Sequence, residues 1–368
     1  MRALVLTSDY VPGNWSGIGT AVACQAAALA QLGVDIEVMV PGSHRAAFAT
    51  QAPGGPVVRP VTPHRCPVRP GEFDLVHLHS LPLSGLAFEI RRRFGLPVVY
   101  TVHSLLDAEL PDTAGLRQWA RVQATVMSSS DAVIFLSAAE YEVAVGRDRG
   151  LASRSRVLPN GVPSPPCLQP SEPAPPSPIV FAGRFARSKG IDLVGAIVRR
   201  MAGEPRLRFI LAGGHSDDMG AAVAGDLTAR HWAYCRVLGW LDRDRLDAVF
   251  AGAGLVLMPS RYEPFGMVAV EAMRMGAPVL ASDVGGLSEI VSGQSGGRLV
   301  RSFDAGDWCE AIRELMGSPA ALTALRCRGP AHVAGHYDSA SLAASLLDTV
   351  FHPLVPGPFR RKRDEGMP

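Results

Sequence analysis

Residues 179–190 read Ile-Val-Phe-Ala-Gly-Arg-Phe-Ala-Arg-Ser-Lys-Gly, a short apolar run followed by glycine and basic residues. The apolar run predicts a buried strand over Ile179–Gly183. A turn follows the glycine, and apolar residues recur at helical spacing from Val194 to Met201, which predicts a helix that starts near Ser188. A buried strand that turns directly into a helix is the repeating unit of a parallel sheet wrapped by helices.

The same pattern continues on both sides of this stretch. Short apolar runs alternate with amphipathic segments of helical length, so the sequence predicts an α/β protein with doubly wound parallel sheets. Further helices are expected over about Thr20–Leu32 and from about Gly266. The expected strands are Arg2–Ser8, Val34–Val40, Leu75–His79, Pro97–Val102, Ala132–Leu136, Arg156–Leu158, Ile179–Gly183, Leu207–Ala212, Arg236–Gly239, Leu255–Pro259 and Pro278–Ser282.

A proline-rich segment interrupts the alternation. Nine of the twenty residues from Pro159 to Pro178 are proline, which lacks an amide hydrogen and disfavours helix in the residue before it. We therefore predict two domains, residues 1–160 and 178–335, joined by a linker over 161–177. The amphipathic segment 339–351 is a candidate to pack back on the first domain. A length of 368 residues agrees with two domains of about 150 residues each.

The composition argues against several classes of protein. A net charge of +2 gives no reason to expect a nucleic-acid partner. No apolar run reaches the roughly 18 residues of a membrane span, and the N-terminus does not resemble a signal peptide. The six cysteines have no metal-ligand spacing, so reduced thiols in a cytoplasmic protein are expected. No D-x-D motif directly follows an apolar strand, which agrees with the expectation of no bound metal, and no cofactor is expected. Of the 36 basic residues all but two are arginine, which draws attention to Lys189.

Charged side chains follow two predicted strands of the second domain. Arg184 and Lys189 flank the turn after the first of these strands, where two cations can clamp a diphosphate. Glu263 and Glu271 follow the strand at 255–259, and carboxylates accept hydrogen bonds from sugar hydroxyls. Surface charges and a chance spacing of the two glutamates are the alternatives. Free backbone amides at the start of the same helix belong to Phe265, Gly266, Met267 and Val268.

The first strand of the chain leads into a glycine-containing loop. Gly17 and Gly19 open the helix that follows, and glycine lets the backbone approach a phosphate closely. Two glycines alone are a weak signal, because the third glycine of a dinucleotide-binding fingerprint is missing. A plain turn is the alternative.

Taken together, these segments resemble the retaining glycosyltransferases of family 4. The motifs G-R-x4-K-G from Gly183, E-P-F-G-x4-E from Glu263 and S-D-V-G-G-x-x-E from Ser282 occur in the order of that family. The resemblance implies the GT-B fold, in which two Rossmann-like domains face each other. It also implies that Arg184 and Lys189 bind the donor diphosphate, that Glu271 binds the ribose hydroxyls, and that Glu263 with the Phe265 and Gly266 amides holds the donor sugar.

The resemblance extends to the first domain. Gly17 and Gly19 match the glycine loop that covers the diphosphate in the family, and His103, at the end of Val-Tyr-Thr-Val-His, would face the donor sugar near C6. A histidine at a strand end is otherwise most often structural. Residues 159–162 resemble the start of the family's P-N-G-V-D motif, but Pro163 replaces its acidic residue, so neither the exact hinge nor a role for that carboxylate carries over from the family.

We therefore predict a retaining glycosyltransferase that moves a hexose or amino-hexose from a nucleotide sugar, with UDP favoured, without a metal ion. Its acceptor is expected to be a small soluble hydroxyl compound, such as an aminocyclitol or another antibiotic intermediate. A membrane-surface enzyme acting on a lipid or envelope glycan, an inactive nucleotide-sugar-binding protein, and an epimerase or phosphorylase are the alternatives. The catalytic candidates are His103, Glu263, Arg184 and Lys189, and the acceptor candidates are Asp9, Trp15, His79 and Asp107.

Overall fold

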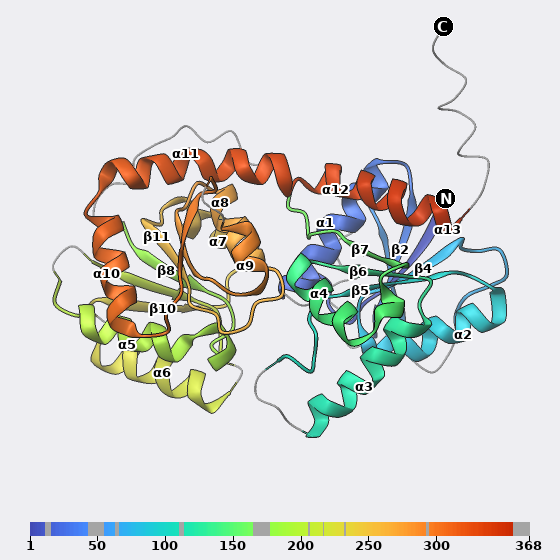
Figure 1. Ribbon diagram of the computed structural model, residues 1–368, viewed down its shortest axis with the longest axis horizontal. Coiled ribbons are helices and arrows are strands. Elements are labelled where there is room, and N and C mark those ends of the chain that lie inside the picture. Colours follow the sequence, from blue (N-terminus) through green and yellow to red (C-terminus); the bar gives the residue numbers. More distant parts are fainter. Residues whose placement is uncertain are drawn as a thin grey trace, which may run out of the picture. The chain divides into compact units, whose positions relative to one another are not determined.

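The chain forms two compact units, each built on its own parallel sheet (Figure 1). Unit 1 comprises Met1–Asp107, Thr113–Pro163 and Ser339–Pro368, and unit 2 comprises Ala108–Asp112 and Ser164–Asp338. The computed structural model describes residues 1–11, 16–42, 55–62, 66–109, 114–164, 177–204, 207–215, 217–231, 233–291 and 294–355. Most of the predicted linker, residues 161–177, lies outside these ranges.

Unit 1 contains a seven-stranded parallel sheet with the order β3-β2-β1-β4-β5-β6-β7. Every residue of β4 and β5 is buried, as expected for strands with helices on both faces. The order changes direction between β1 and β4, and open α/β sheets bind ligands at the carboxyl ends of strands at such a point. The elements are β1 (Arg2–Leu6), α1 (Gly17–Gln31), β2 (Asp35–Pro41), β3 (Val57–Val61), β4 (Leu75–Leu78), η2 (Leu81–Leu83), α2 (Ser84–Phe94), β5 (Val98–Val102), α3 (Ala114–Ser129), β6 (Ala132–Phe135), α4 (Ala138–Arg147), η3 (Arg149–Leu151) and β7 (Ser155–Val157).

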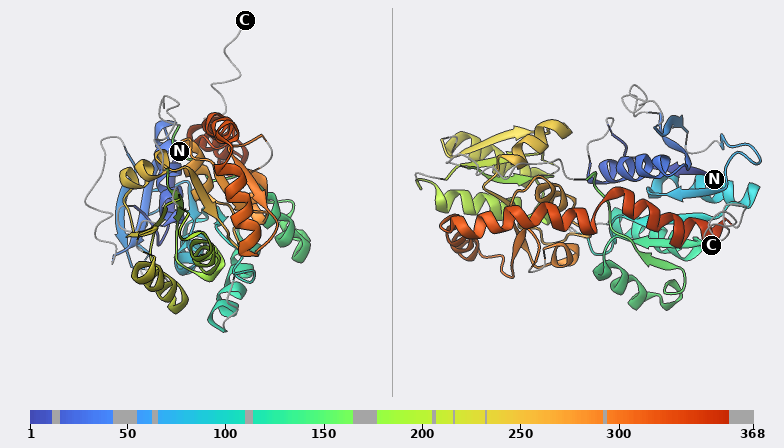
Figure 2. Two further views of the ribbon diagram at one scale, coloured as in Figure 1. Left: turned by 90° about the vertical axis from the view of Figure 1, so that its left-hand side faces the viewer. Right: turned by 90° about the horizontal axis from the view of Figure 1, so that it is seen from above.

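The C-terminal segment also belongs to unit 1. Helix α12 (Ser339–Leu346) packs along α1, as both views from the front and from above show (Figures 1 and 2). It continues into the π-helical segment η5 (Leu347–Phe351) and the short helix α13 (His352–Leu354). Five residues of this segment join the hydrophobic core of unit 1: Ala343, Leu346, Leu347, Val350 and Phe351.

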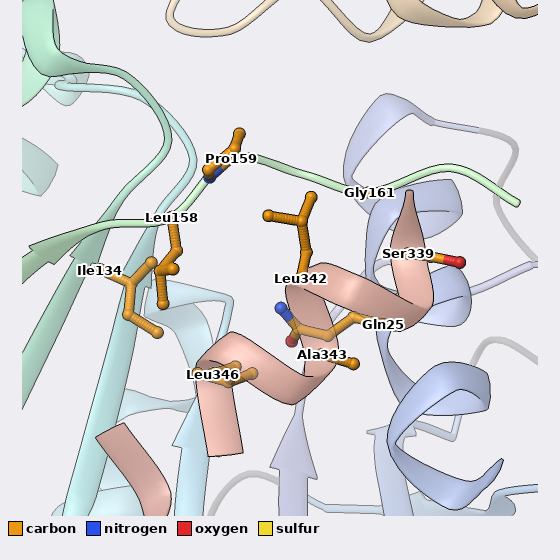
Figure 3. Close-up of a pocket in the computed structure, with 9 residues that line it drawn as sticks. All are labelled: Gln25, Ile134, Leu158, Pro159, Gly161, Ser339, Leu342, Ala343 and Leu346. Atoms are coloured by element: carbon orange, nitrogen blue, oxygen red, sulfur yellow. The ribbon is translucent and has the colours of Figure 1, made fainter. Parts of the chain in front are cut away.

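A small pocket lies where α12 meets α1 and the chain that follows β7. Figure 3 shows Gln25 of α1 beside Leu342 and Ala343 of α12, with Leu158 and Pro159 on the other side. Apart from Gln25 and Ser339 the side chains that line it are apolar, and none of the candidate catalytic residues is among them. The pocket is therefore a packing feature of the returning helix.

Unit 2 contains a six-stranded parallel sheet with the order β10-β9-β8-β11-β12-β13, which changes direction between β8 and β11. Strands β8, β11 and β12 are buried along their whole length. The elements are β8 (Ile179–Ala182), η4 (Arg187–Lys189), α5 (Ile191–Met201), β9 (Phe209–Ala212), α6 (Asp218–Arg230), β10 (Cys235–Gly239), α7 (Arg243–Ala251), β11 (Leu255–Met258), α8 (Met267–Arg274), β12 (Val279–Ser282), α9 (Gly285–Ile290), β13 (Gly297–Val300), α10 (Ala305–Met316) and α11 (Pro319–His336).

The predicted fold class is confirmed, and all eleven expected strands are present with ends within two residues of those predicted. Strands β3 and β13 were not predicted. Both lie at a sheet edge and are partly exposed, and β3 contains Pro60, so neither forms the continuous apolar run of a central strand. Within the described residues, no helix is both long and apolar enough to cross a membrane.

The prediction of a helix from Ser188 was wrong in detail. A single 3-10 turn, η4, comes first, and α5 begins only at Ile191. Gly190 separates the two with φ of 76°, and a Cβ there would lie 2.0 Å from the Pro259 carbonyl oxygen. Only glycine fits this position, so the turn that carries Lys189 is pressed against the end of β11.

Candidate active site

The carboxyl ends of β8 and β11 bring together two of the predicted residues. The Nζ atom of Lys189 lies 2.8 Å from Oε2 of Glu263, and the two side chains are 22% and 10% exposed. The hydroxyl of Ser260 donates to the same carboxylate oxygen at 3.1 Å. An ammonium group has three hydrogens, so Lys189 can hold Glu263 and still donate to an anion.

The glycine motif after β12 supports Glu263 from behind. Gly285 has φ of 48°, and a Cβ at this position would lie 2.3 Å from the Glu263 carbonyl oxygen. The Gly286 amide donates to the same carbonyl at 3.0 Å. The S-D-V-G-G motif therefore positions the backbone of the Glu263 loop, a role that the sequence pattern alone did not reveal.

The Glu263 loop leads into the uncapped N-terminus of α8. No side chain caps this helix at Gly266, and Met267 and Val268 form its half-buried first turn. The amides of a first turn have no partner within the helix and favour an anion. Phe265 is 4% exposed and its ring packs against Tyr337 at a centroid distance of 5.8 Å. Phe265 can therefore contribute to a ligand site through its backbone, while its side chain is part of the core.

Arg184 stands at the carboxyl end of β8 but differs from Lys189. It is exposed and follows Gly183, which has φ of 133°. In the described part of the chain Arg184 forms no ion pair, whereas Lys189 is held by Glu263. The two predicted diphosphate ligands thus consist of one fixed cation and one exposed cation at the same strand end.

Glu271 lies on α8, and its carboxylate is buried beside an arginine that the sequence motifs did not indicate. The Nη1 atom of Arg243, the first residue of α7, lies 2.5 Å from Oε1 of Glu271. Burial raises the pKa of Glu271 above its ordinary value, and the positive charge of Arg243 acts in the opposite direction. Arg243 is 28 positions from Glu271 in the sequence, so no local spacing could have indicated the pair.

An exposed tryptophan follows the neighbouring strand β10. Trp240 is 56% exposed and comes directly after Gly239. Its indole edge lies against Gly214 at the end of β9, where a Cβ would come within 2.3 Å of Nε1. The glycine thus leaves room for the indole at the carboxyl edge of the sheet, three residues before Arg243.

In unit 1, three histidines lie at the ends of β4 and β5: His77 and His79 are buried, and His103 is partly buried. His79 Nδ1 lies 3.0 Å from His103 Nε2, and His77 Nε2 lies 2.8 Å from the Thr101 hydroxyl. Burial lowers the pKa of His103 to about 4 and that of His77 to about 3, and the pKa of His79 also lies well below its ordinary value. All three are neutral at pH 7, so the cluster carries no positive charge. His103, which is partly buried, is the one of the three with side-chain surface that a ligand's hydroxyl group can reach.

The predicted glycine loop of unit 1 is partly engaged within the chain. Ser16 caps α1: its hydroxyl accepts from the Gly19 amide at 2.9 Å and donates to Asp9 Oδ1 at 3.1 Å. Gly17, the first residue of α1, is exposed. Of these two glycines, Gly17 is therefore the one whose backbone is open to a ligand.

The remaining acceptor candidates are dispersed. Asp107 forms an ion pair with Arg147 at 2.5 Å, and both side chains are about half exposed. Trp15 lies outside the described residues. Across the described ranges, no group of three or more histidine, cysteine, aspartate or glutamate side chains is arranged to hold a metal ion.

Comparison with protein families assigns both halves of the chain. The profile described as "Glycosyl transferase 4-like domain" matches residues 16–161, and the profile "Glycosyl transferases group 1" matches residues 176–318. A D-inositol 3-phosphate glycosyltransferase from Nocardia farcinica is 31% identical over 389 residues, covering 92% of this chain and 85% of the relative. Its counterpart from Catenulispora acidiphila is 30% identical and covers 72% of this chain and 69% of the relative.

Solved structures share the fold. Sucrose-phosphate synthase from Thermosynechococcus elongatus has a TM-score of 0.78 at 22% identity, covering 96% of this chain and 99% of that one. Anabaena HepE in complex with UDP-glucose also has a TM-score of 0.78, at 18% identity, covering 95% and 99%. With two Rossmann-like sheets, both family profiles and relatives over most of its length, the chain belongs to the retaining glycosyltransferases of family 4, which have the GT-B fold and use nucleotide sugars.

Proposed function

We propose that this enzyme transfers a hexose or amino-hexose from a UDP-sugar to a hydroxyl of a small cyclitol, with retention of the anomeric configuration and without a metal ion. The observation that carries the donor half is the Lys189–Glu263 pair, 2.8 Å apart, beside the uncapped start of α8. It combines a cation for a diphosphate, a carboxylate for sugar hydroxyls and free amides at one strand end.

The leaving group explains why these groups would accelerate the reaction. When the bond between the anomeric carbon and the diphosphate breaks, negative charge develops on the phosphate oxygens. Lys189, the exposed Arg184 and the first-turn amides of α8 stabilise that charge most strongly when they are already in place. Glu263 fixes Lys189 before the donor arrives, so little reorganisation is needed.

The contacts of Glu263 favour attack from the front face of the sugar over a double displacement. A carboxylate nucleophile needs a free oxygen close behind the anomeric carbon. Here Oε2 of Glu263 accepts from both Lys189 and Ser260, which draws negative charge from the whole carboxylate and makes it a weaker nucleophile. Oε1 is the oxygen that would accept from a sugar hydroxyl. In the proposed course the acceptor oxygen bonds to the anomeric carbon as the diphosphate leaves, and the acceptor proton passes to the departing phosphate.

Two observations support uridine as the donor base. Anabaena HepE, which shares the fold, has been solved in complex with UDP-glucose. In this chain the exposed indole of Trp240 lies at the end of β10, three residues before the arginine that contacts Glu271. In the proposal Glu271 binds the ribose and the exposed indole of Trp240 stacks on the base, as aromatic rings do on nucleobases.

The proposed cyclitol acceptor is supported by the charge of three segments of unit 1 and by the names of the relatives. The segments that follow β1, β4 and β5 (residues 7–16, 79–83 and 103–113) contain four acidic residues and no lysine or arginine. Together with the neutral pair His79–His103, they suit hydroxyl or amine groups better than a phosphate. The relatives are named for an inositol phosphate, which supports a cyclitol ring. We therefore propose an unphosphorylated cyclitol or aminocyclitol as the acceptor.

Two assays test the proposal in sequence. A thermal-shift screen against UDP, GDP, ADP and dTDP should give the largest shift with UDP, and a larger shift with GDP or ADP would overturn the choice of base. Transfer from the best UDP-sugar is then measured with myo-inositol, an aminocyclitol, inositol 3-phosphate and anionic vesicles carrying a glycolipid acceptor. Product from the first two, with the anomeric configuration retained by NMR, is the expected result.

The other outcomes identify the alternatives. Transfer only to inositol 3-phosphate would show that the acidic loops do not exclude phosphate, and transfer only on vesicles would make this a membrane-surface enzyme. UDP binding with no transfer to any acceptor would favour an inactive binding protein.

A further inference from the structure

The buried carboxylate of Glu271 belongs to a row of four alternating charges on two helices. Arg243 Nη1 lies 2.5 Å from Glu271 Oε1, and Arg243 Nε lies 3.2 Å from Asp247 Oδ1. Arg274 Nη1 lies 2.9 Å from the second oxygen of Asp247. The row connects α7, which carries Arg243 and Asp247, to α8, which carries Glu271 and Arg274.

Glu271 would be a poor anion without its partner. It is 5% exposed, and the loss of hydration favours the neutral acid. The charged groups that act on its pKa are Arg243 and Arg274, which lower it, and Asp247, which raises it. The strands packed beside α8, β11 and β12, have no ionisable residue. Helices α9 and α11 also pack against α8, and none of their ionisable residues is among the causes of the shift.

Arg243 also fixes the direction of the carboxylate. Because Arg243 binds Oε1, Oε2 is the oxygen left to accept from a ribose hydroxyl. The guanidinium group is itself held by Asp247, and this two-sided contact needs the planar fork of arginine, which a lysine does not have. Arg243 is 23% exposed on its side chain and is not one of the family motif residues.

We propose that Arg243 is a positioning residue for the nucleotide donor, which keeps Glu271 ionised and oriented so that it can bind the ribose. The inference rests on the proposed function, in which Glu271 binds the donor. Arg243 itself need not touch the nucleotide. Its removal would therefore act through the protonation state of Glu271, which gives the test a signature that a merely structural role lacks.

The test measures UDP affinity by calorimetry between pH 5.5 and 8.5. Arg243→Met should weaken binding at least about tenfold at pH 6, because the buried Glu271 then takes up a proton and no longer accepts from the ribose. Affinity should recover as the pH rises and Glu271 ionises, whereas the wild-type profile should vary less. Arg243→Lys retains a positive charge and should show a smaller loss with a flatter profile.

Controls separate this effect from a general loss of stability. Arg298→Met removes an exposed ion pair of the same unit, Arg298–Glu314 at 2.6 Å, and should leave UDP affinity unchanged. If Arg243→Met does not fold, Arg243→Gln, which keeps a hydrogen-bond donor without the charge, takes its place and should show the same recovery with pH. Wild-type affinity at every pH in either variant would overturn the inference.

Glu271→Gln distinguishes failure of the inference from failure of the proposed function. The substitution should weaken UDP binding without pH-dependent recovery, and Arg243→Met in that background should add no further loss. If Glu271→Gln binds UDP like the wild type, the donor role of Glu271 is wrong. If it binds weakly while Arg243→Met binds normally, the donor role holds and the positioning role of Arg243 is wrong.

Discussion

The two units have the same architecture but opposite chemistry at corresponding places. Both sheets change direction between two adjacent strands, and both carry polar side chains at the carboxyl ends of those strands or their neighbours. In unit 2 these side chains are charged pairs, Lys189–Glu263 and Arg243–Glu271. In unit 1 the corresponding pair is His79–His103, in which both side chains have a lowered pKa. The two sheets thus share the positions of their polar side chains, while the side chains themselves are charged in unit 2 and neutral in unit 1.

The largest expected effect comes from removing the fixed cation of unit 2. Lys189→Ala should lower kcat by about 10²–10³, because a charge-stabilising group is lost where the diphosphate leaves. Steady-state kinetics with UDP-sugar and the best acceptor measures this. The chain offers a matched control, since Lys362 is its one other lysine, and Lys362→Ala should behave like the wild type. If the two variants have equal kcat, Lys189 does not stabilise the leaving diphosphate, and the functional difference between the charged unit 2 and the neutral unit 1 is wrong.

The second effect concerns the stability of unit 1 in acid. An unfolded histidine has a pKa near 6.5, but in the folded unit that of His103 is about 4 and that of His77 about 3. Below pH 6.5 the unfolded chain therefore binds more protons than the folded one, and the folded state loses stability as the pH falls. Between pH 7 and 5 the expected loss is on the order of 2 kcal/mol for each of these histidines.

Hydrogen exchange followed by mass spectrometry at pH 7 and pH 5, corrected for intrinsic exchange rates, measures this loss. Peptides from β4 and β5 should lose protection sooner than those from β8 and β11, although unit 2 also has one histidine with a lowered pKa, His332. His77→Gln should reduce the difference. Earlier loss of protection in unit 2 would contradict the assignment of the neutral, acid-sensitive cluster to unit 1.

A smaller effect is expected at the exposed indole of unit 2. Trp240→Ala should raise the Kd for UDP about tenfold, because stacking on an aromatic ring contributes roughly 1–3 kcal/mol per base. Quenching of tryptophan fluorescence by UDP should also decrease. Trp119 on α3 of unit 1, 43% exposed, is the matched control, and Trp119→Ala should leave UDP binding intact. If the two variants bind UDP equally well, Trp240 is an ordinary surface residue.

The smallest effect is expected at an acidic residue of unit 1. Asp107 is paired with Arg147 and half exposed, and exposed ion pairs contribute little to stability. Asp107→Asn should therefore leave the unfolding temperature unchanged and alter the acceptor KM by about threefold or less. A larger rise in KM for an aminocyclitol than for myo-inositol would sharpen the comparison, because it would assign Asp107 to an amine group.

Most of the fold could be predicted because its central strands are buried on both faces and form continuous apolar runs. The apolar runs at Leu255–Met258 and Val279–Ser282 were sufficient by themselves to predict the strands β11 and β12. The edge strand β3 could not be found in this way, because three of its five residues are exposed. The start of α5 was predicted at Ser188 instead of Ile191. The break at Gly190 depends on its close approach to Pro259, a residue distant in the sequence, so the local pattern does not reveal it.

Part of the candidate site could be predicted because its reactive side chains directly follow predicted strands. Lys189 and Glu263 belong to separate motifs, yet both follow strands that are neighbours in the sheet, and the structure pairs them. The pairing of His79 with His103 follows from the same logic, because β4 and β5 are adjacent and parallel. Arg243 gave no such signal: it is one of many arginines, and only the packing of α7 on α8 brings it to Glu271.

The return of residues 339–351 to unit 1 has a consequence for the order in which the chain is completed during synthesis. Ala343, Leu346 and Phe351 belong to the same core as Val5 and Val22, although more than three hundred residues separate them. On the ribosome, unit 2 is translated in full before the C-terminal segment of unit 1, which begins at Ser339, emerges. Until that segment emerges, the side of α1 that packs against α12 stays exposed to solvent. A chain truncated before Ser339 would leave this apolar side of α1 permanently exposed.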